Sequence, residues 1–453
     1  MKRRLMTTTA LIVILVAQHA FVTGFRYTTR AATTPIYTVI DLGTLGGSMS
    51  YAQSINNSGQ ITGASSLTGD PTDSLGNPIF HAFLDRNRQM VDLGTLGGDS
   101  SFGNAINDFG RVVGDSFLPG NPMAYGGFAR HGVLYTGNIK TDLGSLGGAF
   151  GSSATGINNS GQVVGQADLP DGRLCGFFYD GGVMQQIPTP ASDYTVAYAI
   201  NDSGLIVGTI IPHGSTTQRA FSYNSQGVAH QFTDLGTLGG NFAQAISVDN
   251  SGLMIVGESS LAGPPDSQSL HAFLYQGSMR DLGTLPGDAY SSASHINALG
   301  QVVGWSSPAD FATYRGFLWS NGVMLDLNTL IPASSGWQIS FASGINDLGQ
   351  IVGVGVRNGQ SHAVLLIAPA FSIGVLKELV QSFDLPHGIE SSLIAKLQNA
   401  IASAEAGNFT SACSQLHAFV NQVIAQSGNQ IPTPQASQLL TVANQLRVSL
   451  GCL

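Results

Sequence analysis

Charged residues are scarce in this chain. Only 10% of its 453 residues are Asp, Glu, Lys or Arg, and the formal net charge is −9. A general nucleic-acid binder needs a basic face for phosphates, so this balance argues against such a partner. Glutamate is nearly missing from residues 36–367, where Glu258 is the single example. A hydrolase that uses two glutamates is therefore excluded there, although a pair of aspartates is still available.

Several motifs that carry chemistry are missing as well. The chain has no Gly-x-Ser-x-Gly elbow, no His-Glu-x-x-His, no Cys-x-x-Cys and no phosphate-binding glycine loop. These absences remove the common sequence signs of serine hydrolases, zinc proteases, thiol redox proteins and nucleotide-binding proteins. No catalytic residue and no cofactor is predicted.

Long apolar runs are missing except near the N-terminus. A basic stretch at residues 2–4 precedes an apolar run at residues 11–16, and residues 22–24 offer small side chains for cleavage. This order is typical of a secretory signal, so we expect residues 1–32 to be a signal peptide and a short leader. An uncleaved anchor is the alternative. A signal peptide predicts a secreted protein, extracellular or at the cell surface, without a stable membrane span after cleavage.

The chain is rich in glycine instead, with 58 residues, and many of these belong to a motif written seven times. Each copy has an Ile-Asn-x-x-Gly turn and then a short apolar run that ends in a second glycine. A period of roughly 50 residues, rich in short β-type runs, indicates a repeat architecture. The turn residue is Asn56, Asn107, Asn158, Asn201, Asp249, Asn297 and Asn346. The second glycine is Gly63, Gly114, Gly165, Gly208, Gly257, Gly304 and Gly353.

Each copy predicts four short strands, here called a to d. Four-stranded units at this spacing are the signature of β-propeller blades. The chain opens with a d-like strand at residues 36–42, and the seventh copy has no strand d after residues 362–367. We therefore predict an all-β seven-bladed propeller over residues 33–369, whose last blade is completed by the N-terminal strand. One extra residue between Gly252 and Gly257 predicts a β-bulge in the fifth copy.

Strand c carries a His-Ala-Phe motif. Its aromatic position holds Phe83, Phe128, Phe177, Phe221, Phe273, Phe317 and, in the last copy, Val364. Its histidine is His81, His271 and His362, with Gly126, Cys175, Arg219 and Arg315 at the equivalent positions. Equivalent residues of different blades lie far apart around a ring, so these histidines are expected to be structural and not ligands of one metal ion. The repeated aspartates are expected to be turn or cap acceptors. They are Asp41, Asp92, Asp142, Asp234, Asp281 and Asp326.

These repeats resemble a known family. The segments "DLGTLGG", "INNSGQ" and "HAFLY" are similar to those of the HAF-repeat proteins, and the resemblance covers about residues 36 to 367. It implies an extracellular bacterial repeat protein, and it implies no particular reaction.

After Pro369 the apolar period changes from strand-like to helical. The pattern predicts four amphipathic helices within residues 370–453, which form a small bundle. The apolar face of the first runs from Ile373 to Phe383, before a break at residues 384–388. The next two span about 389–406 and 410–426, and the fourth starts at Thr433. The segment "LIAKLQNAIASAEAGNFTSACSQLHAFVNQV" resembles the FIMAH domain, a C-terminal helical module of secreted bacterial proteins, which implies an accessory role.

The chain has three cysteines. Cys413 lies early in the third predicted helix and Cys452 follows the fourth, so in an up-down bundle the two residues are neighbours. We predict a disulfide between them, in keeping with secretion. Cys175 precedes a strand c and is expected to be a buried free thiol.

The connections between strands b and c, here called the b–c loops, differ most between copies. Variable loops on a regular scaffold are where ligand contacts usually lie. The predicted ligand-binding residues on these loops are Asp70, Asp73, Tyr125, Asp168, Asp171, Arg173, Asp310 and Phe311. Calcium at the Asp70/Asp73 or the Asp168/Asp171 loop is an alternative to solvated acidic loops.

Three functions remain. The favoured one is a non-catalytic scaffold that binds a glycan or protein at the cell surface through the b–c loops. A propeller glycosidase or lyase with aspartates at the channel mouth is the second. A purely structural envelope protein is the third.

Overall fold

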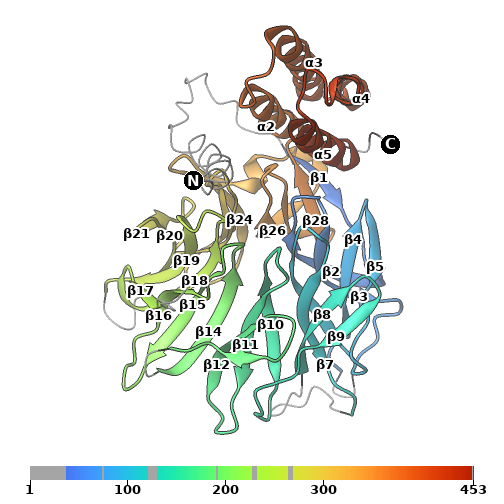
Figure 1. Cartoon of the computed structure of the whole chain (residues 1–453). Helices are drawn as coiled ribbons and strands as arrows, with labels where there is room; N and C mark the ends of the chain where they lie inside the picture. The colour runs from blue at the N-terminus through green and yellow to red at the C-terminus, as the bar shows by residue number, and fades with distance from the viewer. Residues whose placement is uncertain are drawn as a thin grey trace, which may run out of the picture. The chain divides into compact units, whose positions relative to one another are not determined.

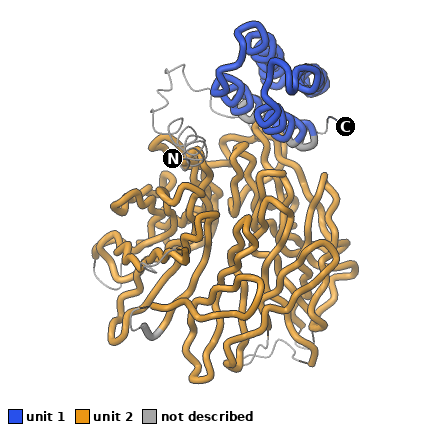
Figure 2. Tube along the Cα trace, in the orientation of Figure 1, with its two compact units in different colours: residues 1–35, 369–453 blue, residues 36–368 orange. Residues whose placement is uncertain are grey.

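The computed structural model describes residues 37–73, 76–120, 130–189, 192–226, 232–263, 269–450 and 452. The predicted signal peptide, residues 1–32, lies outside them. The chain divides into two compact units, Ile36–Ala368 and a unit that holds the helices from Pro369 onward (Figures 1 and 2). No described helix is long and apolar enough to cross a membrane.

The first unit is a seven-bladed β-propeller, as predicted, and each blade is one four-stranded sheet. Blade 1 holds β2 (Gly46–Ile55), β3 (Ile61–Leu67), β4 (Phe80–Arg86) and β5 (Gln89–Asp92). Blade 2 holds β6 (Ser101–Ile106), β7 (Val112–Phe117), β8 (Arg130–Thr136) and β9 (Ile139–Asp142). Blade 3 holds β10 (Ser152–Ile157), β11 (Val163–Asp168), β12 (Leu174–Tyr179) and β13 (Gln185–Gln186). Blade 4 holds β14 (Ser192–Ile200), β15 (Leu205–Pro212), β16 (Arg219–Asn224) and β17 (Phe232–Gly236).

The remaining blades follow the same order. Blade 5 holds β18 (Gly239–Val248), β19 (Ile255–Leu261), β20 (Leu270–Tyr275) and β21 (Met279–Gly283). Blade 6 holds β22 (Tyr290–Ile296), β23 (Val302–Ser307), β24 (Arg315–Ser320) and β25 (Val323–Asp326). Two 3₁₀ turns, Leu327–Thr329 and Ala333–Ser335, lead to blade 7, which holds β26 (Gln338–Ile345), β27 (Ile351–Arg357), β28 (Gln360–Ile367) and β1 (Thr38–Asp41).

The N-terminal strand closes the ring, as the sequence predicts. β1 pairs antiparallel with β28, so that Thr38 lies opposite Ile367 and Asp41 lies opposite Val364. The Tyr37 N–H also donates to the carbonyl oxygen of Leu330 at 2.8 Å. The first and last strands of the propeller therefore share one sheet, and no blade is left with three strands.

The asparagine of each a–b turn explains why the turn forms. Asn56 Oδ1 accepts the backbone N–H groups of Ser58 at 3.0 Å and of Gln60 at 2.9 Å. Gly59 has a φ of 74°, which a residue with a side chain rarely adopts. Side-chain acceptor and glycine together fold the chain back from strand a into strand b.

The second glycine of each copy marks the closest approach of strands a and b. A Cβ at Gly63 would lie 1.9 Å from the carbonyl oxygen of Tyr51, and a Cβ at Gly114 would lie 1.8 Å from that of Phe102. The motif aromatic on strand c lies opposite this glycine and is fully buried, as Phe83 is opposite Gly63. The glycine therefore makes room both for a backbone and for the aromatic ring of the blade core.

The second copy corrects our sequence alignment. Gly114 pairs with Val133 and Ser116 pairs with His131, so Val133 takes the aromatic position and His131 takes the histidine position. The predicted Phe128 and Gly126 lie outside the described residues and occupy neither position. The b–c loop of blade 2 is longer than we assumed, and Val133 fills the core without an aromatic ring to identify it.

The fifth copy corrects a second expectation. Its extra residue lies in the a–b turn, where the Asp249 N–H donates to the Met254 carbonyl instead of to a residue four positions on. The bulge of β18, between Ala245 and Ser247, is the one found on strand a of every blade. The insertion therefore lengthens the turn and adds no bulge of its own.

The described residues of the second unit form four helices: α2 (Pro369–Gln381), α3 (His387–Glu405), α4 (Phe409–Gln426) and α5 (Thr433–Ser449). Asn408, and not a later residue, caps α4, because its side chain accepts the Ser411 N–H. The buried apolar residues include Leu376, Leu397, Leu416, Phe419 and Leu439. A disulfide joins Cys413 to Cys452, whose Cα atoms lie 5.2 Å apart, and Cys175 in the propeller is a buried free cysteine.

Replacement of Gly63 by alanine should destabilise the propeller, because the new Cβ would overlap the Tyr51 carbonyl. Overpacking of this kind costs about 1–3 kcal/mol. Gly182→Ala is the matched control, since nothing lies within 4 Å of its Cβ position. Urea unfolding followed by far-UV circular dichroism should show a lower midpoint for Gly63→Ala alone, and equal midpoints for both variants would contradict the close approach.

Candidate functional site

The two predicted aspartates of the first b–c loop accept hydrogen bonds from neighbouring residues of the protein. Asp70 Oδ1 accepts the Ser48 N–H at 2.8 Å, and this bond holds the pKa of Asp70 below its ordinary value. Asp73 accepts the backbone N–H of Asn77 at 2.9 Å and its side-chain N–H at 3.0 Å. Asp70 thus ties the b–c loop to strand β2, and Asp73 bonds to Asn77 of its own loop.

The third b–c loop behaves similarly. Asp168 is buried and accepts the N–H groups of Gly151 at 2.6 Å and Phe150 at 2.7 Å, which fixes the adjacent connection into blade 3. Asp171 is exposed and pairs with Arg173, Nε to Oδ2, at 2.8 Å. No group of three or more His, Cys, Asp or Glu side chains that could hold a metal ion occurs among the described residues. Tyr125 lies outside them.

The b–c loop of blade 6 carries the most conspicuous surface feature. Phe311 is 45% exposed, and its ring stacks on that of Tyr290, with centroids 4.6 Å apart and planes 17° apart. Tyr314 lies 6.4 Å from Phe311 and 4.8 Å from Phe341 of blade 7, centroid to centroid. Trp305 completes the group at 5.4 Å from Tyr314. We call Tyr290, Trp305, Phe311, Tyr314 and Phe341 the aromatic platform.

The backbone of Phe311 is held in an unusual conformation. Its φ is 53°, which is rare for a bulky residue and costs of the order of 1 kcal/mol or more. The other described non-glycine residues with positive φ are Asp, Asn or Arg. Such outliers persist where the surrounding structure imposes them, and they cluster at functional sites.

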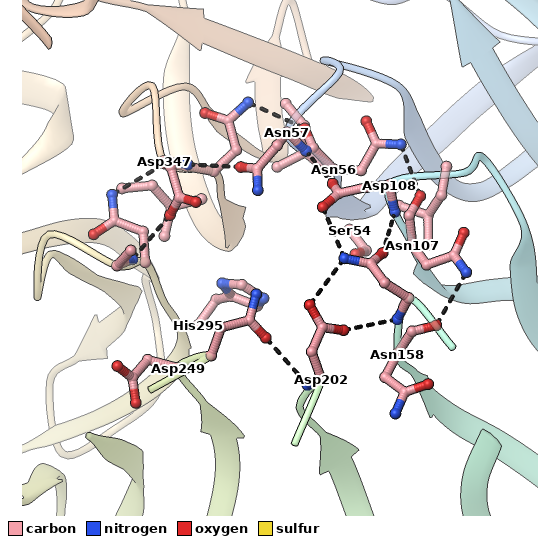
Figure 3. Close-up of a pocket in the computed structure, with 18 of the residues that line it drawn as sticks. Ser54, Asn56, Asn57, Asn107, Asp108, Asn158, Asp202, Asp249, His295 and Asp347 are labelled. Carbon is pink, nitrogen blue, oxygen red and sulfur yellow. Dashed lines mark hydrogen bonds between the residues drawn. The ribbon is translucent and has the colours of Figure 1, made fainter. Parts of the chain in front are cut away.

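At the other face of the ring, the a–b turns meet around the axis and form a belt of hydrogen bonds (Figure 3). Asn56 Nδ2 donates to the carbonyl oxygen of Asn107 at 2.8 Å, and each next asparagine reaches the following blade in the same way. The further bonds run from Asn107 to Asn158, Asn158 to Asn201, Asn201 to Asp249, Asn297 to Asn346, and Asn346 to Asn56.

A second belt follows from the next residue of each turn. The Asn57 N–H donates to Asp108 Oδ1 and the Asp108 N–H to Asn159 Oδ1, both at 2.9 Å. In the same way, the Asn159 N–H donates to Asp202 and the Asp202 N–H donates to Asn250. On the other side of the ring, the Ala298 N–H donates to Asp347 and the Asp347 N–H donates to Asn57. At six of the seven seams, neighbouring blades are therefore tied twice at the axis.

Both belts are broken at the same place, between blades 5 and 6. Asp249 replaces the asparagine of the turn and has no amide to donate to Asn297. Ala298 has no side-chain acceptor for the N–H of Asn250. At this seam Glu258 of β19 reaches Ser292 of β22 by a side-chain hydrogen bond, and burial raises the pKa of Glu258.

The belts surround a cavity of about 190 Å³ at the channel mouth. Its lining includes the carboxylates of Asp108, Asp202, Asp249 and Asp347. Burial raises the pKa of Asp347, and the nearby Asp108 and Asp249 carboxylates raise it further. This mouth is electrostatically negative, although Asp108, Asp202 and Asp347 already accept an N–H of the neighbouring blade and Asp249 accepts one within its own turn.

Next to the mouth lies a second cavity of about 370 Å³, and the bulge on each strand a builds it. In β2, Ala52 pairs with Gly63 and Ser54 with Thr62, so Gln53 is left unpaired and lines the channel. A bulge re-aims one side chain in this way, often beside a functional site. The seven bulge residues all line this cavity: Gln53, Asn104, Thr155, Tyr198, Ile246, Ser294 and Ser343.

His295 lies in the walls of both cavities (Figure 3). Equivalent positions in the other blades hold only Ser, Ala or Gly. One ring nitrogen, Nδ1, is buried and has no hydrogen-bond partner. Burial lowers the pKa of His295 to about 4, so the ring is neutral at neutral pH.

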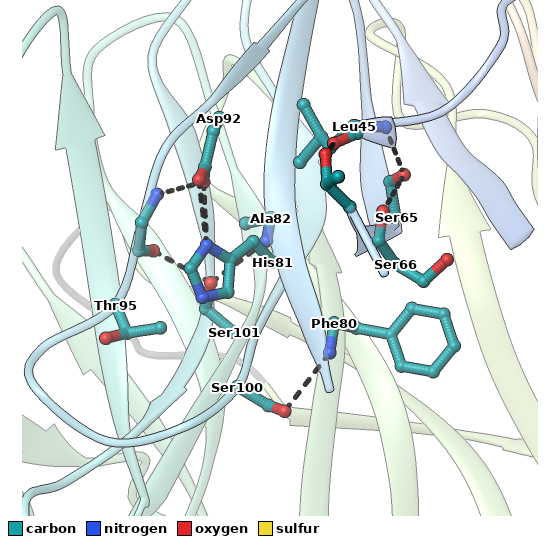
Figure 4. A network of polar contacts seen from close by, with 12 residues as sticks. Leu45, Ser65, Ser66, Phe80, His81, Ala82, Asp92, Thr95, Ser100 and Ser101 are labelled. Atoms are coloured by element: carbon teal, nitrogen blue, oxygen red, sulfur yellow. Dashed lines mark hydrogen bonds and ion pairs between the residues drawn. The ribbon is translucent and has the colours of Figure 1, made fainter. Parts of the chain in front are cut away.

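The repeated histidines and aspartates pair with each other within blades. His81 Nδ1 lies 2.9 Å from Asp92 Oδ2, and Asp92 Oδ1 accepts the Gly94 N–H at 2.6 Å (Figure 4). The other pairs are His131–Asp142, His271–Asp281, His362–Asp41, Arg219–Asp234 and Arg315–Asp326. These residues join strands c and d, which agrees with the structural role expected for them.

A repeated serine ties each blade to the next. Ser101 Oγ accepts the Ala82 N–H at 2.9 Å and donates to the Gly94 carbonyl at 2.8 Å, so it bridges blades 1 and 2 (Figure 4). Ser50, Ser152 and Ser291 do the same at other seams. Backbone groups at the blade edges are thus satisfied by side chains of the neighbouring blade.

Sequence reasoning missed the channel residues. The position two before each Ile-Asn or Val-Asp pair varies freely, from Gln53 to Tyr198 to Ile246, beside a motif that hardly changes. This variation was the available signal, but only the register of strands a and b shows that a bulge turns the position inward. The b–c loops differ in length between copies, which is a stronger sequence signal than the change of residue type at the bulge position.

The channel lining also bears on catalysis. We expected a propeller hydrolase to gather Asp, Arg and Tyr at the axis. Aspartates and Tyr198 do line the two cavities, but their described lining includes no arginine. The aspartate-based glycosidase or lyase stays a prediction.

No family model matches the chain, and no curated protein matches it in sequence. Among solved structures, the β-propeller domain of the Trilobed protease from Pyrococcus furiosus is similar, with 8% identity and a TM-score of 0.46, over 70% of this chain and 95% of that one. A Trypanosoma rangeli sialidase gives 9% identity and a TM-score of 0.39, over 76% and 61%. The Pyrococcus horikoshii acylaminoacyl peptidase gives 10% and 0.41, over 71% and 53%. At these values the likenesses carry no conclusion about what this chain does.

Repair of both belts should stabilise the propeller. The double variant Asp249→Asn/Ala298→Asn supplies the missing donor and the missing acceptor at the seam between blades 5 and 6. Each new hydrogen bond should contribute about 0.5–1.5 kcal/mol, so the thermal unfolding midpoint should rise.

Asn107→Asp is the converse variant, because it removes a donor from an intact seam. It should lower the midpoint in the same calorimetric experiment. Two variants that shift the midpoint in the same direction would show that the belts do not hold the blades together.

Glu258 should make stability depend on pH. Since burial raises its folded-state pKa, the folded protein binds the proton more tightly than the unfolded chain does. The free energy of unfolding should therefore fall as pH rises from about the ordinary carboxyl pKa through the raised value. Glu258→Gln should flatten this part of the urea-midpoint profile relative to the parent protein, and parallel profiles would contradict the assignment.

Proposed function

We propose that this chain is a secreted, non-catalytic glycan-binding protein that holds its ligand on the b–c loop face, with the aromatic platform as anchor. One observation carries the proposal, namely the exposed ring of Phe311, presented by a left-handed backbone and stacked on Tyr290. A buried position for this ring would explain the strain by packing, but the ring is 45% exposed.

The loop that presents Phe311 is pre-organised. The Phe311 N–H donates to the Pro308 carbonyl at 3.1 Å, and the Ala312 N–H donates to Asp310 Oδ1 at 3.0 Å. Ser307 Oγ donates to the Thr313 carbonyl at 2.9 Å. A site that is ordered before binding loses less conformational entropy when the ligand arrives, which favours affinity. The predicted ligand residue Asp310 would thus act on the turn and Phe311 on the ligand.

The chemistry of the platform suits a sugar ring. The face of an aromatic ring carries negative charge density, which attracts polarised C–H groups, and a flat ring offers a large apolar area at little entropic cost. The phenol groups of Tyr290 and Tyr314 add polar contacts at the edge. A protein partner that inserts an apolar side chain is the other outcome that the experiment below separates.

Secretion is part of the proposal. The basic and apolar order of residues 1–32 and the disulfide between Cys413 and Cys452 support an oxidising, extracellular location. The helical unit would then be an accessory module, as its resemblance to the FIMAH domain implies. Calcium is not required for the platform and remains an addition to be tested at the acidic loops.

The test is a glycan array with the purified protein, followed by calorimetric titration of the best ligand. Phe311→Gly removes the ring and relieves the left-handed strain, so the loop should keep its path, and affinity should fall about tenfold or more, as for the loss of a buried aromatic anchor. Phe109→Ala is the matched control, because Phe109 is also an exposed phenylalanine, at 71%, but lies on an a–b turn.

Full retention of glycan binding by Phe311→Gly would overturn the platform assignment. Failure to bind any glycan, together with capture of a defined cell-surface protein that Phe311→Gly abolishes, would replace the glycan with a protein partner. If neither the glycan array nor the capture experiment detects a ligand, the structural envelope protein would be favoured.

A further inference from the structure

We infer that the 370 Å³ cavity of the central channel is a second binding site, and that it takes a small uncharged polyhydroxyl compound, such as a monosaccharide or a cyclic polyol. This inference does not rest on the aromatic platform, since its residues come from strand a of each blade and not from the b–c loops.

The first argument is the origin of the walls. Seven bulges, one on each strand a, turn a side chain into the channel at the same level. A structure that needed only to close the ring could use the same residue in nearly every blade, as it does for the turn asparagine, which occurs in six of the seven copies. The bulge position instead holds amide, hydroxyl, phenol and aliphatic groups, which gives the cavity different sides. Its volume lies within the range of small-molecule sites.

The second argument is that three of the four bulge residues with free polar groups lie on one arc, while the fourth, Tyr198, lies on blade 4. Asn104 and Thr155 are already used between blades, since Asn104 Nδ2 donates to Ala154 O and Thr155 Oγ1 to Ala197 O. Gln53, Ser294 and Ser343 have no side-chain hydrogen bond to any residue that the structure describes. These three residues belong to blades 1, 6 and 7, which are neighbours in the closed ring.

His295 adds a buried group to the same arc. Its Nδ1 is buried without a partner, and an unsatisfied buried polar atom is costly unless a ligand or water meets it. Ile246 and the ring of Tyr198 contribute apolar surface from blades 5 and 4, on other parts of the wall. Amide and hydroxyl groups beside apolar surface match a ring compound that bears hydroxyl groups.

The third argument is charge. The described lining of this cavity includes no Asp, Glu, Lys or Arg. A cation would lose its hydration there without a counter-charge, and such a transfer is unfavourable. An anion would meet the same cost and, in addition, the carboxylates of Asp108, Asp202 and Asp347 at the adjacent mouth. The cavity therefore favours a neutral ligand.

The experiment uses the full chain and four probes: D-glucose, myo-inositol, glucosamine and glucuronate. Saturation-transfer NMR and calorimetry should detect a neutral probe, while the charged glucosamine and glucuronate bind more weakly. Ser343→Leu fills the cavity and should reduce affinity for the neutral probe about tenfold or more. Ser278→Leu, on an exposed turn, is the matched control and should leave affinity unchanged.

Ser294→Ala serves as a second variant if Ser343→Leu does not fold, because it removes one hydroxyl group without adding volume. It should weaken binding of the neutral probe by a few-fold, the effect of one neutral hydrogen bond. Phe311→Gly should have no effect on this site, and the cavity variants should have none on glycan binding by the platform, so the two proposals fail independently.

Three results would overturn the inference. No binding of either neutral probe would mean a channel that holds only water. Binding that survives Ser343→Leu, or that Phe311→Gly abolishes, would place the site elsewhere. Glucuronate that binds as tightly as glucose would contradict the argument from charge.

Discussion

The side-chain amide of the turn asparagine is the interaction on which the ring depends. Its oxygen closes the a–b turn of its own blade, and its nitrogen reaches the carbonyl group of the next blade. One residue therefore sets both the tightness of the turn and the distance between neighbouring blades. The channel, its mouth and the bulge residues take their positions from this spacing. A change of residue here, as at Asp249, therefore removes a hydrogen bond between two blades and not only one within a turn.

The repeated residues hold the blades together, whereas the variable residues form the two candidate sites. Glycine, serine, histidine and aspartate recur because backbone approach, blade contact and strand pairing pose the same problem seven times. The bulge position recurs in every blade but holds different residue types, and Phe311 lies on a loop whose length differs between blades. The two candidate sites lie on different parts of the blades, one on the b–c loops and one on strand a.

Much of the fold could be predicted because its causes are local. Turn glycines, the period of the motif and the orphan first strand were enough to predict seven blades and their closure by β1. The alignment of the second copy was wrong because Val133 packs where other blades use an aromatic ring. The channel site could not be predicted, since a bulge depends on the pairing register of two strands. For the loop aspartates, residue type alone did not distinguish a ligand contact from a bond to nearby backbone, such as the bonds that Asp168 makes to the connection into blade 3.

Ring closure by β1 has a consequence for the order of assembly. β1 is the first strand of the propeller to be synthesised, yet its partner β28 is the last, and the pair His362–Asp41 spans 321 positions of sequence. Contacts of such long range form late and slowly. Until β28 arrives, the nascent chain carries an unpaired strand at one end and an open sheet edge at the other, which are the features that chaperones and proteases recognise. Pairing of β1 with β28 in blade 7 is thus the step that closes the ring and pairs these strand edges.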